Sequence, residues 1–274
     1  MKKTSKVISI ILSVLMLMQM MTGVVFASGK TKLGAPTNIR CAQDENEEDV
    51  TNYQFSVNLP SGLDKNSVTY EMCIGGYVQG KAVLTNFLGN ATEPEFDIWN
   101  NDVNDAFNDW KEEYEVSRSA VLFGFYVKSL NGGYSDSDMV ITDTKGDIQN
   151  ISGGIGGKCS GGACWTFSNG TLTFFGNGTA DKPAFDVNED DVETIIFESG
   201  VTAFDELMGF YNFPSLKYIY INNDNFSTEN SIFRDSSHYI VVFAPKNSTF
   251  HNAIEGTYDS DFKFMDIETG SENY

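Results

Sequence analysis

The sequence is poor in basic residues and in histidine. Its 274 residues include 18 Lys and Arg against 38 Asp and Glu, which gives a formal net charge of −20. Because nucleic-acid affinity comes mainly from neutralisation of phosphates by Lys and Arg, this balance argues against a nucleic-acid partner. The two histidines, His238 and His251, are interpreted as solvated residues of loops or strand ends. Without a G-x-S-x-G motif, a phosphate loop or a dinucleotide fingerprint, the sequence favours a protein that is not an enzyme.

Long hydrophobic runs are also scarce, and the one that is present lies at the amino terminus. Three lysines precede an apolar stretch, residues 7–21, and a Val-x-Ala cleavage site follows at Val25-Phe26-Ala27. This arrangement is typical of a secretory signal peptide, here residues 1–27, with an uncleaved anchor as the alternative. We therefore expect a secreted or extracellular protein, at the cell surface or free, with no stable membrane span after processing.

Only four cysteines are present, and their spacing argues against zinc. Paired Cys-x2-Cys units are absent, and the two histidines add few ligands. Cys159 and Cys164 enclose four residues, Ser-Gly-Gly-Ala, so a local disulfide and a pair of free thiols are both open. Pairing of Cys41 with Cys73 depends on a strand register that the sequence does not reveal.

Glycine is concentrated in one place, and this divides the chain. Seven of the seventeen residues from Gly146 to Gly162 are glycine. Such a stretch predicts a linker, placed at residues 144–158, between two domains. Apolar residues make up 41% of the chain and aromatic residues 13%, which is enough for a sizeable core on both sides of it.

The part before the linker predicts an antiparallel β domain that is interrupted by one helix. Residues 53–57, 68–74 and 121–128 are rich in β-branched and aromatic residues and are separated by turn signals. Between Trp99 and Tyr114, large apolar residues recur every three or four positions, which predicts an amphipathic helix. Its two tryptophans are interpreted as core residues, with a sugar-stacking platform as the alternative.

This first part resembles a fibronectin type III domain over residues 33–143. The segment Ala35-Pro36-Thr37-Asn38-Ile39 is similar to the first strand of that family, and Gly133-Tyr134-Ser135-Asp136-Ser137 is similar to the bend before its last strand. The resemblance implies a β-sandwich that serves as a spacer or as a binding platform.

The second part contains an internal repeat. Val192, Ile195 and Phe197 have the spacing L-x-x-L-x-L, and the same spacing returns 24 positions later at Leu216, Ile219 and Ile221. A third strand begins about 23 positions on, with Tyr239, Val242 and Ala244 in the three positions. A period of 20–29 residues with this apolar spacing is typical of leucine-rich repeats, whose units stack to bury one another. A predicted hairpin over residues 165–175, with Asn-Gly at its turn, caps the stack.

The second part resembles the BspA-type leucine-rich repeat proteins over residues 159–266 and just before. The matching segments are Gly157-Lys158-Cys159, Trp165-Thr166, Gly170-Thr171-Leu172-Thr173, Gly176-Asn177-Gly178, Glu198-Ser199-Gly200-Val201-Thr202, Phe210 to Leu216 and Asn247-Ser248-Thr249-Phe250. The resemblance implies a short solenoid in an exported or surface protein that binds other proteins or cells.

The repeats also predict a candidate partner-binding face. Residues between the core positions of each strand point away from the core, and they form two rows: Thr194, Tyr218 and Val241 in one, Ile196, Tyr220 and Phe243 in the other. Five of these six side chains are apolar or aromatic, and an exposed patch of this kind marks an interaction site. The alternative is that the first domain or a second copy of the chain covers it.

Two acidic runs leave calcium as an alternative ligand. The run from Asp186 to Asp191 has the one-three-five spacing of a calcium loop, but Asp191 stands in the glycine position and Phe197 in that of the last glutamate. The run at residues 44–49 is interpreted, like this one, as a solvated loop, so no cofactor is expected.

Together these patterns predict an exported, non-catalytic, mainly β interaction protein. Its partner is a protein or glycan outside the cell. A carbohydrate-associated or glycosidase-like protein and a structural spacer without a ligand remain as alternatives, since carboxylates are abundant and a glycosidase needs only two.

Overall fold

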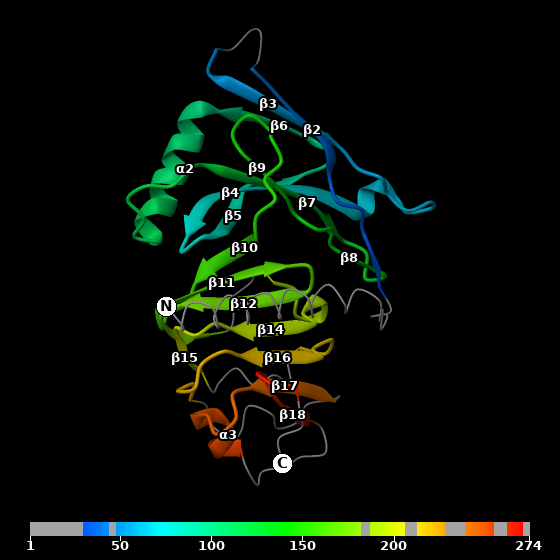
Figure 1. The fold of residues 1–274 in the computed structure, drawn as a ribbon. Helices are drawn as coiled ribbons and strands as arrows, with labels where there is room; N and C mark the ends of the chain where they lie inside the picture. The colour runs from blue at the N-terminus through cyan, green and yellow to red at the C-terminus, as the bar shows by residue number, and fades with distance from the viewer. Residues whose placement is uncertain are drawn as a thin grey trace.

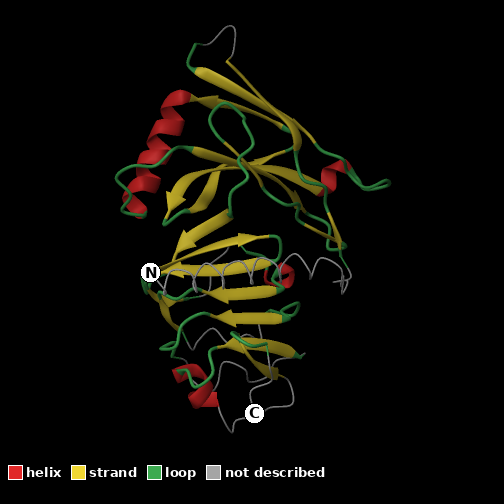
Figure 2. Ribbon diagram, in the orientation of Figure 1, coloured by secondary structure: helices red, strands yellow, loops and turns green. Residues whose placement is uncertain are grey.

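The computed structural model describes residues 30–43, 48–181, 187–205, 213–227, 239–254 and 262–270. The fold is mainly β, as the sequence predicts (Figures 1 and 2). The predicted signal peptide, residues 1–27, lies outside the described residues, as does His238.

Among the described residues, one sheet of eleven strands runs through both parts of the chain (Figure 1). In spatial order its strands are β18 (Phe262–Asp266), β17 (Ile240–Ala244), β16 (Tyr218–Ile221), β14 (Thr194–Phe197), β12 (Thr171–Gly176), β11 (Ala163–Ser168), β10 (Gly153–Lys158), β5 (Lys81–Ala91), β4 (Val68–Val78), β7 (Leu122–Ser129) and β9 (Val140–Thr142). Strands β12, β14, β16, β17 and β18 pair in parallel. Strands β5, β4, β7 and β9 pair antiparallel. We call β1 to β9 the amino-terminal part and β11 to β18 the carboxyl-terminal part.

Smaller elements complete the described fold. A three-stranded sheet has the order β2-β3-β6, and two pairs, β1–β8 and β13–β15, are parallel. The bounds of these elements are β1 (Thr31–Lys32), β2 (Thr37–Gln43), β3 (Val50–Ser56), β6 (Glu95–Trp99), β8 (Tyr134–Ser135), β13 (Gly178–Ala180), β15 (Val201–Phe204), α2 (Asn100–Glu113), α3 (Thr249–Ile254), and the 3-10 turns η2 (Lys65–Ser67) and η3 (Glu189–Asp191).

The amino-terminal core lies between the small sheet and the large one. Tyr53 and Phe55 of β3 pack with Phe123 and Phe125 of β7, at ring-centroid distances between 5.3 and 5.8 Å. Strands β3 and β6 of the small sheet largely alternate buried and exposed residues and turn one apolar face to the large sheet, whereas β4 and β7 of the large sheet are buried along most of their length.

Helix α2 confirms the predicted helix between Trp99 and Tyr114. Phe107, Trp110 and Tyr114 are buried on its sheet-facing side, and the Phe107 and Trp110 rings stack at 5.5 Å. The two tryptophans differ, however. Trp110 is a core residue with 2% exposure, whereas Trp99, the residue before the helix, is 49% exposed.

The glycine-rich segment differs from its prediction. We expected a linker at residues 144–158, but residues 153–158 form strand β10, which pairs in parallel with β5 and antiparallel with β11. Glycine fits here because there is no room for side chains. A Cβ on Gly154 would lie 2.1 Å from the carbonyl oxygen of Phe167, and one on Gly157 would lie 2.6 Å from the indole nitrogen of Trp165. Residues 153–158, whose composition is typical of a flexible linker, are therefore the strand that joins the amino-terminal and carboxyl-terminal parts in one sheet.

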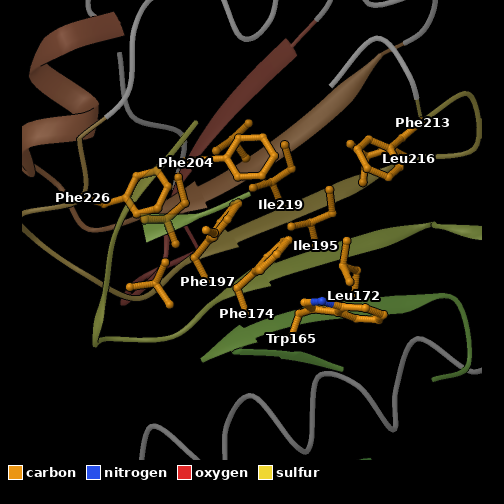
Figure 3. Packing of buried hydrophobic residues seen from close by; sticks show 14 of the residues in the cluster. Trp165, Leu172, Phe174, Ile195, Phe197, Phe204, Phe213, Leu216, Ile219 and Phe226 are labelled. Atoms are coloured by element: carbon orange, nitrogen blue, oxygen red, sulfur yellow. The ribbon is translucent and has the colours of Figure 1, made fainter. Parts of the chain in front are cut away.

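The carboxyl-terminal core confirms the predicted hairpin and most of the repeat positions. Strands β11 and β12 pair around Asn169 and Gly170, whose φ angles of 53° and 72° suit the tight turn of a two-residue hairpin. The apolar positions of the first two repeats are buried: Val192, Ile195, Phe197, Leu216, Ile219 and Ile221. Figure 3 shows four of them, Ile195, Phe197, Leu216 and Ile219. In the third, Val242 and Ala244 are buried, but the placement of Tyr239 in the core is wrong because it is 54% exposed.

Side chains also bind the two parts together. Cys164 and Phe175, from β11 and β12, pack into the amino-terminal core. Lys81 of β5 lies 2.8 Å from Glu198, and its ammonium group lies 5.6 Å from the centre of the Phe175 ring. The two parts therefore pack on each other as well as sharing a sheet.

Replacement of Gly154 by alanine should lower the free energy of unfolding by about 2–3 kcal/mol, because the added Cβ overlaps a backbone oxygen that can move only if β10 and β11 separate. Gly132→Ala is the matched control, since a Cβ there would meet nothing within 4 Å. Urea unfolding followed by circular dichroism measures both, and equal midpoints for the two variants would contradict this role of β10.

Candidate functional site

The six residues of the candidate face lie in the register that the repeat spacing predicts. Tyr218 of β16 pairs with Thr194 on one side and Val241 on the other, and Tyr220 pairs with Ile196 and Phe243 in the same way. Because the strands are parallel and the side-chain period is two, each row crosses β14, β16 and β17 on one face of the sheet.

Burial separates this face from the core. The residues that alternate with the six, including Ile195, Ile219 and Val242, have no exposed surface. All six residues of the candidate face are instead partly exposed. Figure 3 shows Ile195, Phe197 and Ile219 packed with the core residues, as expected for the opposite side of the same strands.

The aromatic side chains of the face are ordered by direct stacking. The rings of Tyr220 and Phe243 lie 4.6 Å apart and are within 4° of parallel. The two rings stack face to face and hold each other in place in one row. The six residues carry no formally charged side chain, and their polar groups are the hydroxyls of Thr194, Tyr218 and Tyr220.

Burial affects the ionisation of Tyr220. Loss of solvent, and to a lesser extent the neighbouring Tyr218, raises the pKa of Tyr220 to about 12. The Tyr220 phenol therefore stays neutral near neutral pH.

The rows extend beyond the six predicted residues. On one side, Thr171 and Thr173 of β12 pair with Thr194 and Ile196. On the other, Lys263 and Met265 of β18 pair with Val241 and Phe243. The repeat spacing could not find these residues, because neither β12 nor β18 carries the L-x-x-L-x-L pattern.

The candidate face is continuous with the amino-terminal core. Thr166, next in the row after Thr173, lies two residues from Cys164, so both side chains are on the same side of β11. Cys164 packs into the amino-terminal core. The small sheet therefore covers this side of the large sheet in the amino-terminal part, while the side chains of β14, β16 and β17 on this side stay partly exposed.

The two cysteines that could form a local disulfide are free thiols. Cys159 packs into the carboxyl-terminal core and Cys164 into the amino-terminal core, so they belong to opposite sides of the sheet. Burial raises the pKa of the Cys159 thiol to about 12, which leaves it unreactive at neutral pH. Cys41 and Cys73 are likewise not joined by a disulfide.

The acidic run that ends at Asp191, interpreted as a solvated loop with calcium as the alternative, is held by contacts within the protein. Asn188 accepts a hydrogen bond from the backbone N–H of Asp190 and donates one to Asp191, and Lys30 forms ion pairs with both aspartates. Burial raises the pKa of Asp191, which works against a highly charged loop. Asp186 and residues 44–47 of the other acidic run lie outside the described residues. Within the described ranges, no three His, Cys, Asp or Glu side chains are grouped as metal ligands would be.

His251 contradicts its interpretation as a solvated residue. It lies on α3 with 6% exposure, and its ring lies 4.8 Å from that of Phe264. Among the described residues, neither ring nitrogen has a hydrogen-bond partner. The ring therefore packs α3 on β18 as an apolar side chain would. The sequence could not indicate this burial, because histidine is a polar residue.

Replacement of Tyr220 by phenylalanine should make stability less sensitive to alkaline pH. In the wild-type chain the raised pKa of Tyr220 keeps its proton in the folded state, so its contribution is full below pH 10 and is lost as pH rises towards about 12. The melting temperature of the variant should fall less steeply across this range. Tyr239→Phe, at an exposed position, is the control and should follow the wild-type slope. Identical slopes for Tyr220→Phe and the wild-type chain would show that Tyr220 is not desolvated.

No helix in the described ranges is long and apolar enough to cross a membrane. Comparison with models of known protein families gives no match, and comparison with curated proteins gives no significant match either. The chain's function must therefore be argued from its own residues.

Proposed function

We propose that the chain is an exported, non-catalytic interaction protein that binds another protein through the candidate face. In this proposal the carboxyl-terminal part is a short leucine-rich repeat solenoid of the BspA type, and the amino-terminal part is a fibronectin type III-like sandwich. The amino-terminal run of residues 1–27 is its secretory signal, which directs it to the outside of the cell or to the cell surface.

One observation carries the proposal. Two rows of partly exposed side chains, five of the six apolar or aromatic, cross three adjacent strands in regular register. Monomeric proteins seldom expose so regular an apolar surface, and aromatic residues at the centre of a patch supply most of the binding energy of protein interfaces.

The repeat assignment is supported by the burial of its apolar positions. In the first two repeats all six are buried, and strands β14, β16, β17 and β18 stack in parallel, as units that bury one another would. Strand β12 of the hairpin β11–β12 pairs with β14 of the first repeat, so the hairpin fits the cap that a short array needs.

The charge of the chain limits the kind of partner that the candidate face can bind. The chain carries −20 overall, whereas the six residues of the candidate face carry no formal charge. Acidic partners would be repelled at long range, so a neutral or basic protein surface with an exposed apolar patch fits best.

The double replacement of Tyr218 and Tyr220 by serine should abolish partner capture and leave the fold intact. We expect the free energy of unfolding to fall by no more than about 2 kcal/mol, mainly through loss of the Tyr220–Phe243 stack. The measurement is capture of proteins from host or neighbouring-cell extracts by the immobilised full chain, with thermal unfolding of both proteins in parallel.

Leu130→Ser is the matched control, since Leu130 is 60% exposed in the amino-terminal part, away from the candidate face. It should capture the same proteins as the wild-type chain. Unchanged capture by the double variant would refute the proposal, and so would loss of its folding, which would make the two tyrosines core residues.

A further inference from the structure

A second surface lies on the outer side of the small sheet, away from the candidate face. The register of β2, β3 and β6 sets its side chains in three rows: Arg40, Gln54 and Glu95, then Ala42, Asn52 and Asp97, then Val50 and Trp99. We call these residues the outer face. With the exception of Val50 and the half-buried Asn52, they are exposed.

Trp99 is the unusual member of this face. The other two tryptophans, Trp110 and Trp165, are 2% and 4% exposed, whereas Trp99 is 49% exposed at the end of β6. Its register partner, Val50, is 4% exposed, so the indole stands beside a buried apolar residue. An exposed tryptophan offers a flat apolar surface. The C–H groups on one face of a pyranose ring stack on such a surface, while the hydroxyls of the sugar stay free to form hydrogen bonds.

Hydrogen bonds order the polar groups next to Trp99. The Asn52 side-chain amide donates to Asp97 Oδ1 at 2.7 Å and to Glu95 Oε1 at 2.8 Å. Gln54 donates to the same Glu95 oxygen at 2.8 Å. Each amide therefore directs its NH2 group towards a carboxylate and its carbonyl oxygen away from it. This network holds four side chains in place before a ligand binds, which lowers the entropic cost of binding.

The same network sets the chemistry of the surface. Hydrogen bonds from Gln54 and Asn52 lower the pKa of Glu95, so it is an acceptor at neutral pH. The carboxylate and amide oxygens accept hydrogen bonds, and the Arg40 guanidinium donates them. Sugar hydroxyls both donate and accept, and they match such a mixed set better than an apolar or a purely charged ligand would.

Spacing and charge define the kind of glycan. Residues two apart on one strand are about 6.6–6.8 Å apart, so the two polar rows follow Trp99 along β6 at that interval. A chain of sugars that starts on the indole would pass over Asp97 and then over Glu95. Two carboxylates against one guanidinium, in a chain of net charge −20, disfavour acidic glycans such as polyuronates.

We propose that the outer face is a binding site for an uncharged oligosaccharide or polysaccharide, with Trp99 as the stacking platform and with Asn52, Gln54, Glu95, Asp97 and Arg40 as hydrogen-bonding partners of its hydroxyls. This site is separate from the candidate face and does not depend on the function proposed for it.

Native affinity electrophoresis of the full chain tests the site. The gels contain xyloglucan, galactomannan or mixed-linkage β-glucan as neutral probes and polygalacturonate as an acidic one. We expect at least one neutral probe to retard the wild-type chain. Trp99→Ala should weaken that affinity about tenfold or more, since tryptophan anchors dominate such contacts. Trp99→Phe should restore most of it, and Asp97→Ala should weaken it severalfold.

Tyr239→Ala is the matched control, because it removes an aromatic residue of similar exposure from the carboxyl-terminal part. It should bind like the wild-type chain. Protection of the exposed tryptophan from acrylamide quenching by the same probe gives a readout in the unaltered chain, should Trp99→Ala fail to fold. The proposal is overturned if no neutral probe retards the chain, if only polygalacturonate does, or if folded Trp99→Ala binds as tightly as the wild-type chain.

Discussion

The backbone pairing of β10 with β5 on one side and β11 on the other is the interaction on which the rest of the structure depends. It turns two sets of strands, each with its own core, into one continuous sheet. The pairing requires a strand almost without side chains, because a Cβ at Gly154 would meet the backbone of β11 and the indole of Trp165 lies against Gly157. Larger residues in this strand would separate its neighbours, so glycine here supports rigid geometry rather than flexibility.

A continuous sheet has two continuous sides, and this explains where the candidate face lies. Its rows of Tyr218 and Tyr220 belong to the side on which the small sheet covers the amino-terminal strands. Cys164 and Phe175 mark the place where that cover ends. The partly exposed rows are thus an extension of an interior surface, which accounts for their apolar character.

Sequence patterns predicted the features that local periodicity determines. Burial of Ile195 and Ile219 follows from their spacing, and the outward rows follow from the alternation between core positions. The hairpin follows from Asn169 and Gly170, which accept positive φ angles. Strand β10 could not be predicted this way, because its pairing with β5 joins residues about 70 positions apart and its composition is typical of a linker. The sides of the sheet on which Cys159 and Cys164 lie also depend on strand pairing, so local spacing could not place them. Spacing likewise could not separate the exposed Trp99 from the buried Trp110.

The two proposed surfaces are related through the same sheet, and this relation limits how they can act. The candidate face is one side of the large sheet, and the outer face is the far side of the small sheet packed on that same side, about 10 Å further out. Adjacent strands also twist by about 20–25°, so β14 to β17 are turned substantially away from the strands beneath the small sheet. A single flat ligand cannot contact both surfaces. The two proposals therefore concern separate sites, a neutral glycan on Trp99 and a protein on the rows around Tyr220, and occupation of one does not block the other.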